Sequence, residues 1–392
     1  MKKTLVAVAA LAASAAFAQS SVTLYGVADA YFGTQKSAAA HGTGNPAPAV
    51  VQNPSQTVVN NGGLSESRLG VSVKEDLGAG LSAFAVIEGA VGLDNGAGGL
   101  GANRKSVVGL SGDFGAVSLG QQLTPARDAL EGIIDNQSNS AFSALGASVA
   151  GDATVAGTGY AGATTRDAYG NSVRYDTPNF DGFSGAIQIG FGENKANGTA
   201  TTLGAAANRG YSFNVKYENG PLGVVLAHQN DKANTPFVAG PPAAQATSTR
   251  NKLTAIGGYY DFGVAKLNLG YARATNDFRS TANPPALTVT GNGDRTRTWN
   301  IGVVVPVDAF TFVAQYATSK QSGAYTIAAT PNLRATGNSK SFALEGRYAL
   351  SKRTTAYVGY NSTKDNSAIS VAPASANSSK SNRFGVGMRH VF

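Results

Sequence analysis

The side chains of this 392-residue chain limit the chemistry that it could carry out, since it has no cysteine and only three histidines. His41, His228 and His390 lie far apart in the sequence, and none has the spacing of a metal-ligand pair. Residues 96–101, GAGGLG, fit the G-x-G-x-x-G pattern, but no helical pattern or βαβ unit follows them. H-E-x-x-H, P-loop and G-x-S-x-G motifs are absent from the sequence. We therefore expect no catalytic residue, no metal and no cofactor.

Charged side chains make up 14% of the chain, with 31 basic and 23 acidic residues and a formal net charge of +8. The basic residues form no cluster with interleaved aromatic residues, so nucleic acid is not an expected partner. Isolated charges can still act together through the electric field that they create, provided that the fold holds them in place. The secondary-structure elements that carry these charges therefore determine the electric field that the charges create.

Period-two alternation of apolar and polar residues runs along the chain and predicts half-buried β-strands. Residues 211–217, YSFNVKY, place Tyr, Phe and Val on one parity and Ser, Asn and Lys on the other. The last ten residues, RFGVGMRHVF, alternate in the same way and end on Phe392. Aromatic residues near strand ends are candidates for interfacial girdles: Tyr25, Tyr217, Trp299, Tyr348, Tyr360 and Phe392.

Two kinds of connector alternate between the predicted strands. Seven are tight turns rich in Gly, Asp, Asn and Pro, such as Glu75–Gly78 and Asp261–Gly263. Eight are long and of low complexity, and they span about 33–64, 93–104, 123–170, 192–209, 231–251, 276–295, 320–338 and 365–380. These connectors divide the chain into sixteen strands of about ten residues, which predicts an all-β, antiparallel transmembrane β-barrel. A soluble β-sandwich is the alternative.

The barrel has to close, because lipid offers no hydrogen-bond partner to an open sheet edge. The first strand, Val22–Phe32, is therefore expected to pair with the last, Ser381–Phe392. Residues 1–18 have two lysines, an apolar stretch and an Ala-Phe-Ala cleavage pattern, which predicts a secretory signal peptide. Residues 19–392 are then a single exported barrel domain, located in the cell outer membrane.

Five stretches, in order, carry a resemblance to a known family: SSVTLYGVADAYFG, ESRLGVSVKEDLGAGLSAFAVIE, NRKSVVGLSGDFGAVSLGQQLTP, NSVRYDTPNFDGFSGAIQIG and FGVGMRHVF. They resemble the trimeric general porins of Gram-negative outer membranes, in the branch common in β-proteobacteria and neisseriae. The resemblance implies a homotrimer in which each sixteen-stranded barrel encloses a water-filled pore. It also implies a surrounding of outer-membrane lipid and lipopolysaccharide, and a terminal Phe392 that the barrel-assembly machinery reads as an insertion signal.

The same resemblance implies that the third long connector, residues 123–170, folds inward and narrows the pore. Asp128, Glu131 and Asp135 lie near its start and would face cations across the lumen. Arg68 and Arg174 are expected to point inward, because each alternates with apolar neighbours, and the resemblance places Arg68 on a constriction arginine and Arg174 on or beside another. Of Arg104 and Lys105, one should face inward, and the alternation does not decide which.

The expected activity is passive diffusion of small hydrophilic solutes and ions. Removal of Lys2 and Lys3 with the signal peptide leaves 29 basic and 23 acidic residues, a net charge of +6, which favours weak anion selectivity. A substrate-specific porin of the same fold is an alternative. A barrel hydrolase, with His228 as the only suitably placed histidine, and a plugged adhesin are less favoured, because the inward positions are small, polar or charged.

Overall fold

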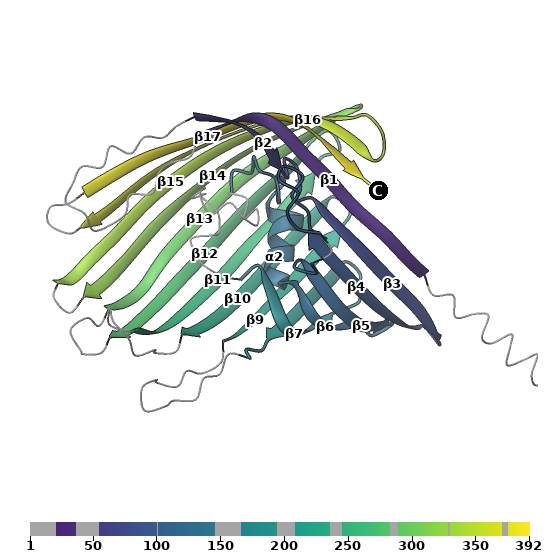
Figure 1. The fold of residues 1–392 in the computed structure, drawn as a ribbon, viewed down its shortest axis with the longest axis horizontal. Helices are drawn as coiled ribbons and strands as arrows, with labels where there is room; N and C mark the ends of the chain where they lie inside the picture. Colours follow the sequence, from purple (N-terminus) through teal and green to yellow (C-terminus); the bar gives the residue numbers. More distant parts are fainter. Residues whose placement is uncertain are drawn as a thin grey trace, which may run out of the picture.

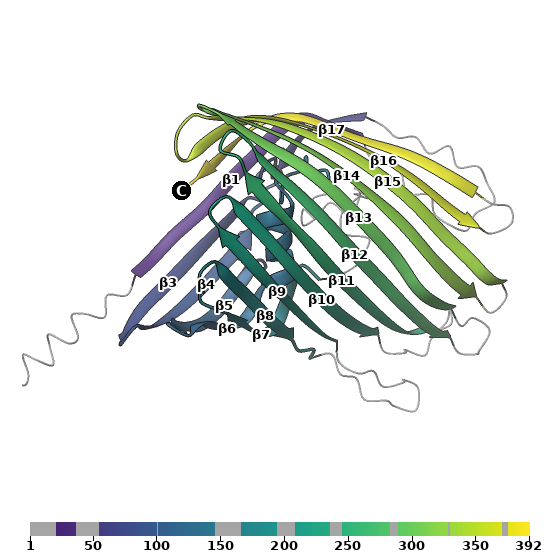
Figure 2. The same cartoon turned by 180° about the vertical axis from the view of Figure 1, so that it is seen from behind.

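A computed structural model of the chain describes residues 21–36, 55–99, 101–145, 166–193, 208–235, 245–282, 289–327, 330–370 and 375–392. The predicted signal peptide, residues 1–18, lies outside these residues, as do residues 146–165 of the predicted inward connector. The strands form one antiparallel sheet that closes on itself as a barrel (Figures 1 and 2). Within the described part of the chain, no helix has the length and apolar character needed to cross a membrane.

The wall begins with short strands and continues with long ones. The first half contains β1 (Ser21–Lys36), β2 (Ser55–Asn61), β3 (Arg68–Gly78), β4 (Leu81–Ala90), β5 (Lys105–Gly112), β6 (Gly115–Leu123), β7 (Ala168–Asp176) and β8 (Phe183–Gly190). The second half contains β9 (Arg209–Asn219), β10 (Leu222–Thr235), β11 (Gln245–Asp261), β12 (Lys266–Ala282), β13 (Val289–Val307), β14 (Phe310–Ile327), β15 (Thr330–Ala349), β16 (Thr354–Ser370) and β17 (Ser375–Val391).

The described residues contain seventeen strands that fill sixteen positions in the wall, because β2 and β3 share one position. Residues 30–36 of β1 pair with β2, and residues 21–27 of β1 pair with β3. Residues 62–67, between β2 and β3, leave the wall at this point. The predicted sixteen-stranded antiparallel barrel is confirmed, and one of its strands is interrupted.

The seam between the two ends of the chain closes as expected. β1 and β17 are antiparallel, with Val27 opposite Val391 and Lys36 opposite Asn382. The backbone of Phe392 adds two hydrogen bonds with Gly26, of 3.0 and 3.1 Å. The terminal residue is therefore held by the wall, and no unpaired edge is left beside it.

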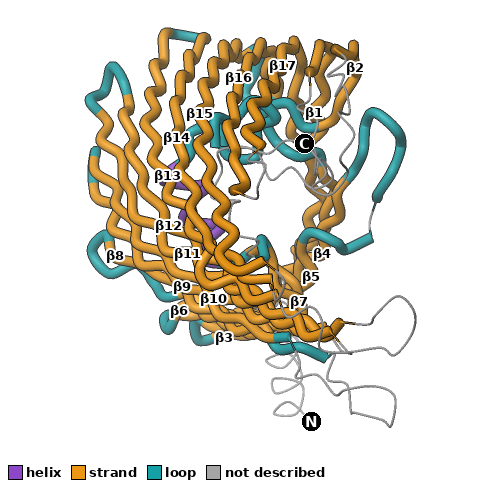
Figure 3. Tube along the Cα trace, turned by 90° about the vertical axis from the view of Figure 1, so that its left-hand side faces the viewer, coloured by secondary structure: helices purple, strands orange, loops and turns teal. Residues whose placement is uncertain are grey.

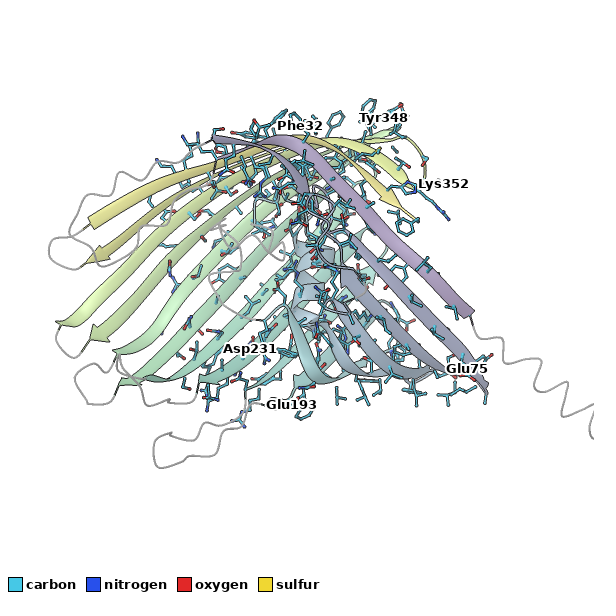
Figure 4. All side chains as sticks on the ribbon, in the orientation of Figure 1. Phe32, Glu75, Glu193, Asp231, Tyr348 and Lys352 are labelled. Carbon is cyan, nitrogen blue, oxygen red and sulfur yellow. The ribbon has the colours of Figure 1, made fainter. Side chains whose placement is uncertain are left out.

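The burial pattern of the strands is the reverse of that in a soluble barrel. One parity carries large apolar side chains that are exposed on the outside, among them Ile187, Val215, Leu226, Ile256, Leu269 and Ile301. The other parity carries small polar side chains that are buried inside, among them Gln188, Ser212, Asn214, Gln229, Thr298 and Asn300. Figure 4 shows Phe32 and Tyr348 on the outer side of the wall. Such a surface suits lipid outside and polar contents inside.

The seven tight turns lie at one end of the barrel, where Figure 4 labels Glu75 and Lys352. The ends of the described strands that border the long connectors lie at the other end (Figure 1). The expectation of about ten residues per strand was wrong for β11–β17, which have 17–20 residues. These strands extend into segments predicted as connectors, because backbone pairing continues above the apolar band and does not require apolar side chains.

Candidate functional site

The third long connector enters the barrel as a short helical segment. It begins at Thr124, whose side-chain oxygen accepts a hydrogen bond from the Arg127 N–H and so caps α2 (Pro125–Ala129). Pro125 suits the first turn, where its missing N–H leaves no hydrogen bond unmade. A π-helical turn, η1 (Leu130–Ile134), follows directly. Figure 3 shows these helices inside the ring of strands, so the described part of the connector lies in the lumen.

An apolar face of this segment packs against the inner wall. Ile133 and Ile134 are buried there. Their wall partners are mostly small or branched apolar residues of β10–β12: Val225, Ala227, Leu253, Ala255, Ala272 and Ala274. A Cβ atom at Gly257 would lie 2.6 Å from Ile134 Cγ1, so this glycine makes room for the loop. Asn268 and Asn300 donate hydrogen bonds to the Ile134 carbonyl oxygen. Apolar burial and these two amides hold the loop on β10–β12.

Asp128 contacts one of the two arginines that alternation placed in the lumen. Its carboxylate lies 2.7 Å from Nη2 of Arg174 on β7. Arg174 also contacts Asp176 at 2.6 Å and donates a hydrogen bond to the Leu123 carbonyl oxygen. Burial raises the pKa of the Asp128 carboxyl, and the Arg174 charge opposes that rise. Arg174 therefore connects the base of the inward loop to the wall.

Arg68 lies in a second cluster, with acids that sequence reasoning did not select. Its Nε is 3.6 Å from Glu88 of β4, and its Nη1 donates a hydrogen bond to the Glu66 carbonyl oxygen. Arg104 forms ion pairs with Glu66 and, at 2.8 Å, with Glu88. Tyr25 donates a hydrogen bond of 2.9 Å to Glu88. The assignment of Tyr25 to an outer girdle was therefore wrong, because its hydroxyl faces the lumen cluster.

Both Arg104 and Lys105 lie on the lumen side of the wall, although only one of them was expected to face inward. Lys105 is opposite Glu88 in the ladder and therefore shares its face of the sheet. Arg104 precedes the first residue of β5, so strand alternation does not apply to it, and its side chain turns to the same Glu88.

The other two loop acids contact mainly residues of the loop itself, and Asp135 also contacts Gln315 of β14. Glu131 pairs with Arg127 one turn earlier, and it also interacts electrostatically with Arg104. Asp135 accepts hydrogen bonds from the Gln137 N–H at 2.8 Å and from the Ser143 hydroxyl at 3.0 Å. Burial of Asp135 raises the pKa of its carboxyl to about 6. Of the three predicted loop acids, Asp128 alone forms an ion pair with a predicted wall arginine among the residues that the structure describes.

The lumen ion pairs differ in which partner faces water. In two wall pairs the arginine is more exposed, with Arg68 at 27% against Glu88 at 12%, and Arg347 at 27% against Glu345 at 0%. In the wall pair of Arg174 and Asp176 the acid is more exposed, at 39% against 12%. At the loop base, the acid is more exposed, with Asp128 at 26% against Arg174 at 12%, and Glu131 at 20% against Arg127 at 15%. β3 and β4 lie across the ring from the β10–β12 wall that carries the loop.

The far part of the described loop is anchored by Phe142. Its ring, fully buried, lies 5.1 Å from the ring of Tyr31 and 6.4 Å from that of Tyr357. A Cβ atom at Gly359 would lie 2.2 Å from the Phe142 ring, and one at Gly385 would lie 3.2 Å from it. The two glycines of β16 and β17 therefore form the seat that receives this side chain.

Asp29 fixes the excursion, residues 62–67, which leaves the wall between β2 and β3. Its buried carboxylate accepts hydrogen bonds from the N–H groups of Gly63, Leu64 and Ser65, at 2.8–3.0 Å, and from the Tyr357 hydroxyl. The inward loop rests on this excursion, since Ser140 Oγ and the Ala141 N–H donate hydrogen bonds to Gly63 O. One carboxylate of β1 thus positions residues 62–67, which Ser140 and Ala141 of the loop contact.

A second buried carboxylate holds the segment that leads out of the loop. Asp231 of β10 accepts hydrogen bonds from the Arg166 N–H at 2.8 Å, the Tyr169 hydroxyl at 2.6 Å and the Gln229 side chain at 2.8 Å. The Arg166 guanidinium lies 4.5 Å from the centre of the Tyr169 ring. Asp231, labelled in Figure 4, lies on β10.

Sequence reasoning missed Asp29, Glu66, Glu88 and Phe142. Glu88 lies on the same inward face of β4 as Phe84 and Val86. Because these two residues are apolar, β4 does not show the alternation of apolar and polar residues that marks the inward positions of other strands. Asp29 is an acid between apolar neighbours at inward parity, which is a signal that a search for buried charges could have used.

His228 lies on the outer face, where its Nδ1 is 2.8 Å from Thr254 Oγ1 and its ring lies beside Tyr211 and Phe213. Among the described residues, no group of three or more His, Cys, Asp and Glu side chains could hold a metal ion.

Comparison with known proteins agrees with this geometry. A family model described as "Gram-negative porin" matches residues 4–368. The outer membrane porin protein 32 of Delftia acidovorans is 36% identical over 270 residues, which cover 68% of each chain. An outer membrane porin protein of Bordetella pertussis is 31% identical over 419 residues, with full coverage of both chains. A solved structure described as an anion-selective porin from Comamonas acidovorans has a TM-score of 0.65 at 26% identity, covering 95% of this chain and 100% of that one.

Proposed function

Because this chain belongs to the Gram-negative porin family and is a channel of the outer membrane, we propose that it passes small hydrophilic solutes and ions by diffusion, with a weak preference for anions. The observation that carries the preference is the exposure of the wall arginines, since Arg68 and Arg347 are more exposed to water than the carboxylates that pair with them. The similar structure described as an anion-selective porin supports the same direction.

We assign the constriction to Arg68, Arg104, Lys105 and Arg174, with Asp128, Glu131 and Asp135 of the loop. Arg68 of the wall and Asp128 of the loop are charges of opposite sign that are each partly exposed to the lumen, and together they would create a field in it. Such a field aligns polar solutes and ordered water, whereas an apolar solute would displace that water without replacing its hydrogen bonds. No bond-making step is part of this function.

A reversal potential measured for the purified protein in a planar bilayer, under a KCl gradient, tests the preference. We expect a potential of the sign given by chloride permeating faster than potassium. A clear potassium preference would overturn the assignment of the wall arginines as the dominant groups.

We also propose that three copies assemble through the short wall. Strands β4–β8 have 8–10 residues, and a tilted strand of eight residues spans only about 19 Å, less than the apolar band of about 25 Å. Neighbouring subunits would cover this wall better than lipid. Trimers on unboiled gels, and inter-subunit crosslinks from cysteines placed on β4 and β5 but not on β13, are the expected results; crosslinks from β13 alone would contradict this interface.

A further inference from the structure

The lumen contains a cavity of about 410 Å³ on the connector side of the barrel, next to the ion-pair cluster of Arg68, Arg104 and Glu88. Glu66 belongs to both, since it lines the cavity and pairs with Arg104. A volume of this size falls within the range of about 300–1,000 Å³ that is typical of small-molecule sites. Five segments converge on the cavity: β1, β2, the connector after β4, the inward loop and β17.

One wall of the cavity is made by residues 91–99 of the second long connector, which fold back on the end of β4. The Gly99 N–H donates a hydrogen bond of 2.9 Å to the Ala90 carbonyl oxygen. Gly98 has a φ of +90°, and a Cβ atom there would lie 2.1 Å from the same carbonyl oxygen, so glycine is needed for this packing. The GAGGLG stretch of the sequence therefore contributes to the wall of a cavity.

Amide side chains of β1 and β2 provide part of the polar lining. Asn60 is opposite Tyr31 in the ladder, and its amide group donates hydrogen bonds to the Tyr31 hydroxyl at 3.1 Å and to Gln35 Oε1 at 3.3 Å. Among the described residues, these bonds leave Asn60 Oδ1 and the NH₂ group of Gln35 without a partner. Both residues are half-buried and line the cavity, so one acceptor and one donor group are held in place for a ligand.

Two amides of the connector face the same cavity. Asn95 Oδ1 accepts a hydrogen bond from the Ala97 N–H at 2.8 Å, and Asn103 Oδ1 accepts one from the Ala90 N–H at 2.9 Å. These contacts fix both side chains through their oxygen atoms. Within the described part of the chain, the two NH₂ groups make no hydrogen bond, and they remain as donors.

The charged side chains of the lining do not favour an anion. Glu66 pairs with Arg104, and Arg383 donates a hydrogen bond of 2.7 Å to the Ala141 carbonyl oxygen of the inward loop. Asp94 is the other carboxylate of the lining, and it is exposed to water. Two carboxylates against one guanidinium leave no excess of positive charge around the cavity. The groups that remain for a ligand are mainly neutral amides.

We propose that this cavity binds a neutral saccharide of one or two sugar units inside the channel. Each sugar hydroxyl can both donate and accept a hydrogen bond, which matches an array of amide NH₂ groups and amide oxygens. Hydrogen bonds between neutral groups gain little over those with water, so we expect a dissociation constant on the order of millimolar, weak enough for the solute to leave the channel. The inference deepens the proposed diffusion of hydrophilic solutes and rests on it, but it does not depend on the ion preference.

The test uses three variants that leave every charge in place. Gln35→Met removes one amide of the lining, and Gln56→Met, opposite Gln35 in the ladder but outside the lining, is its matched control. Gly98→Ala disturbs the connector wall without changing any polar side chain.

Sucrose is the probe, and its binding to each full chain is measured in two ways. Ligand-detected NMR in neutral detergent reports binding without conduction, and single-channel records in a planar bilayer report block of the current. Maltose, glycylglycine and succinate are then compared as competitors of sucrose, because they are respectively neutral, zwitterionic and anionic.

We expect sucrose to bind the unmodified chain saturably and to reduce its single-channel current with the same dissociation constant. Gln35→Met should weaken binding by about threefold to tenfold, as expected for the loss of hydrogen bonds between neutral groups, and Gly98→Ala should weaken it at least as much. Gln56→Met should bind sucrose as the unmodified chain does. All three variants should keep the reversal potential and the current without sugar, so a failure of the channel assignment would be seen separately.

Three results would overturn the proposal. An open channel without saturable sucrose binding would mean that the cavity holds only water. Equal sucrose binding by Gln35→Met and Gln56→Met would mean that sucrose binds elsewhere in the lumen. Displacement of sucrose by glycylglycine or succinate at a lower concentration than by maltose would mean that the charged groups, and not the amides, select the ligand.

Discussion

The Asp128 carboxylate of the inward loop lies 2.7 Å from the Arg174 guanidinium of β7, and this ion pair joins the inward loop to the barrel wall. Asp128 is the more exposed of the two side chains, so a passing ion meets the carboxylate before the arginine. The two residues therefore have opposite expected effects on ion preference, although they form one contact.

Replacement of these partners should shift the ion preference in opposite directions. Asp128→Asn removes an exposed negative charge and should raise the chloride-to-potassium permeability ratio, whereas Arg174→Gln and Arg68→Gln should lower it. A unit charge about 6 Å from the ion path, in water, changes the free energy of each ion by about 0.7 kcal/mol, with opposite sign for chloride and potassium, which is about tenfold in the ratio. Reversal potentials at low salt measure it. Unchanged ratios for both arginine variants would remove these residues from the constriction.

Phe142→Ala should loosen the loop while leaving the barrel closed. Loss of a fully buried phenylalanine side chain costs about 3–5 kcal/mol, and here the cost falls on loop docking between Tyr31 and Tyr357. We expect faster proteolysis within residues 123–170 and additional current fluctuations in single-channel records. Phe342→Ala, on the outer face, is the control. Gly359→Ala should have the same effects as Phe142→Ala, because its methyl group would occupy the space of the Phe142 ring. An absence of additional current fluctuations in both variants would contradict the anchoring role of Phe142.

Asp29→Asn should destabilise the protein more than Tyr357→Phe. The carboxylate accepts hydrogen bonds from three N–H groups of the excursion and from the tyrosine hydroxyl, all buried or partly buried. The asparagine amide group cannot accept them all, and each buried donor left unpaired costs about 1–3 kcal/mol. Removing the hydroxyl takes away one donor, at about 1 kcal/mol. Denaturant midpoints in detergent would measure both; a larger loss for Tyr357→Phe would be inconsistent with this account.

The folded state should gain stability as pH falls from 7 to 4 through Asp135. Burial raises the pKa of this loop carboxyl from 3.8 to about 6. The folded chain therefore binds the proton at a pH at which the unfolded chain does not, and protonation relieves the cost of the buried charge. The gain is at most about 3 kcal/mol, and it is complete below pH 3.8. Asp135→Asn should flatten this part of the pH profile of unfolding, whereas Asp94→Asn, at an exposed position, should not. An unchanged slope in Asp135→Asn would contradict the assignment.

Deletion of Phe392 separates a signal role from a structural one. The residue closes the seam through two backbone hydrogen bonds to Gly26, and its ring lies 2.4 Å from where a Gly26 Cβ atom would be. If Phe392 is an insertion signal, as the family resemblance implies, its deletion should abolish assembly in cells while refolding in detergent remains efficient. Loss of both would assign the residue to the seam alone. Gly26→Ala, which disturbs the ring and keeps the terminus, is the matched variant.

Much of the wall could be predicted from the sequence because strand alternation and turn chemistry are local. The parity of Arg68 and Arg174, the seven tight turns and the pairing of β1 with β17 follow from a two-residue period and from the need to close a sheet in lipid. The ends of the strands on the connector side could not be predicted from the sequence. Above the apolar band, polar residues continue the backbone hydrogen bonding between strands, and no change in hydrophobicity marks where it stops.

The contents of the lumen depended on contacts between residues far apart in the chain. Asp29 with Gly63, Ser140 with Glu345, and Arg104 with Glu66 meet only when the barrel has closed and the loop has folded into it. Alternation assigns a side chain to the inside of the wall, but it carries no information on which inward residue stands across the ring. That choice is made by the apolar burial of Ile133 and Ile134 on β10–β12 and by the glycine seat of Phe142, which together set where each loop charge lies.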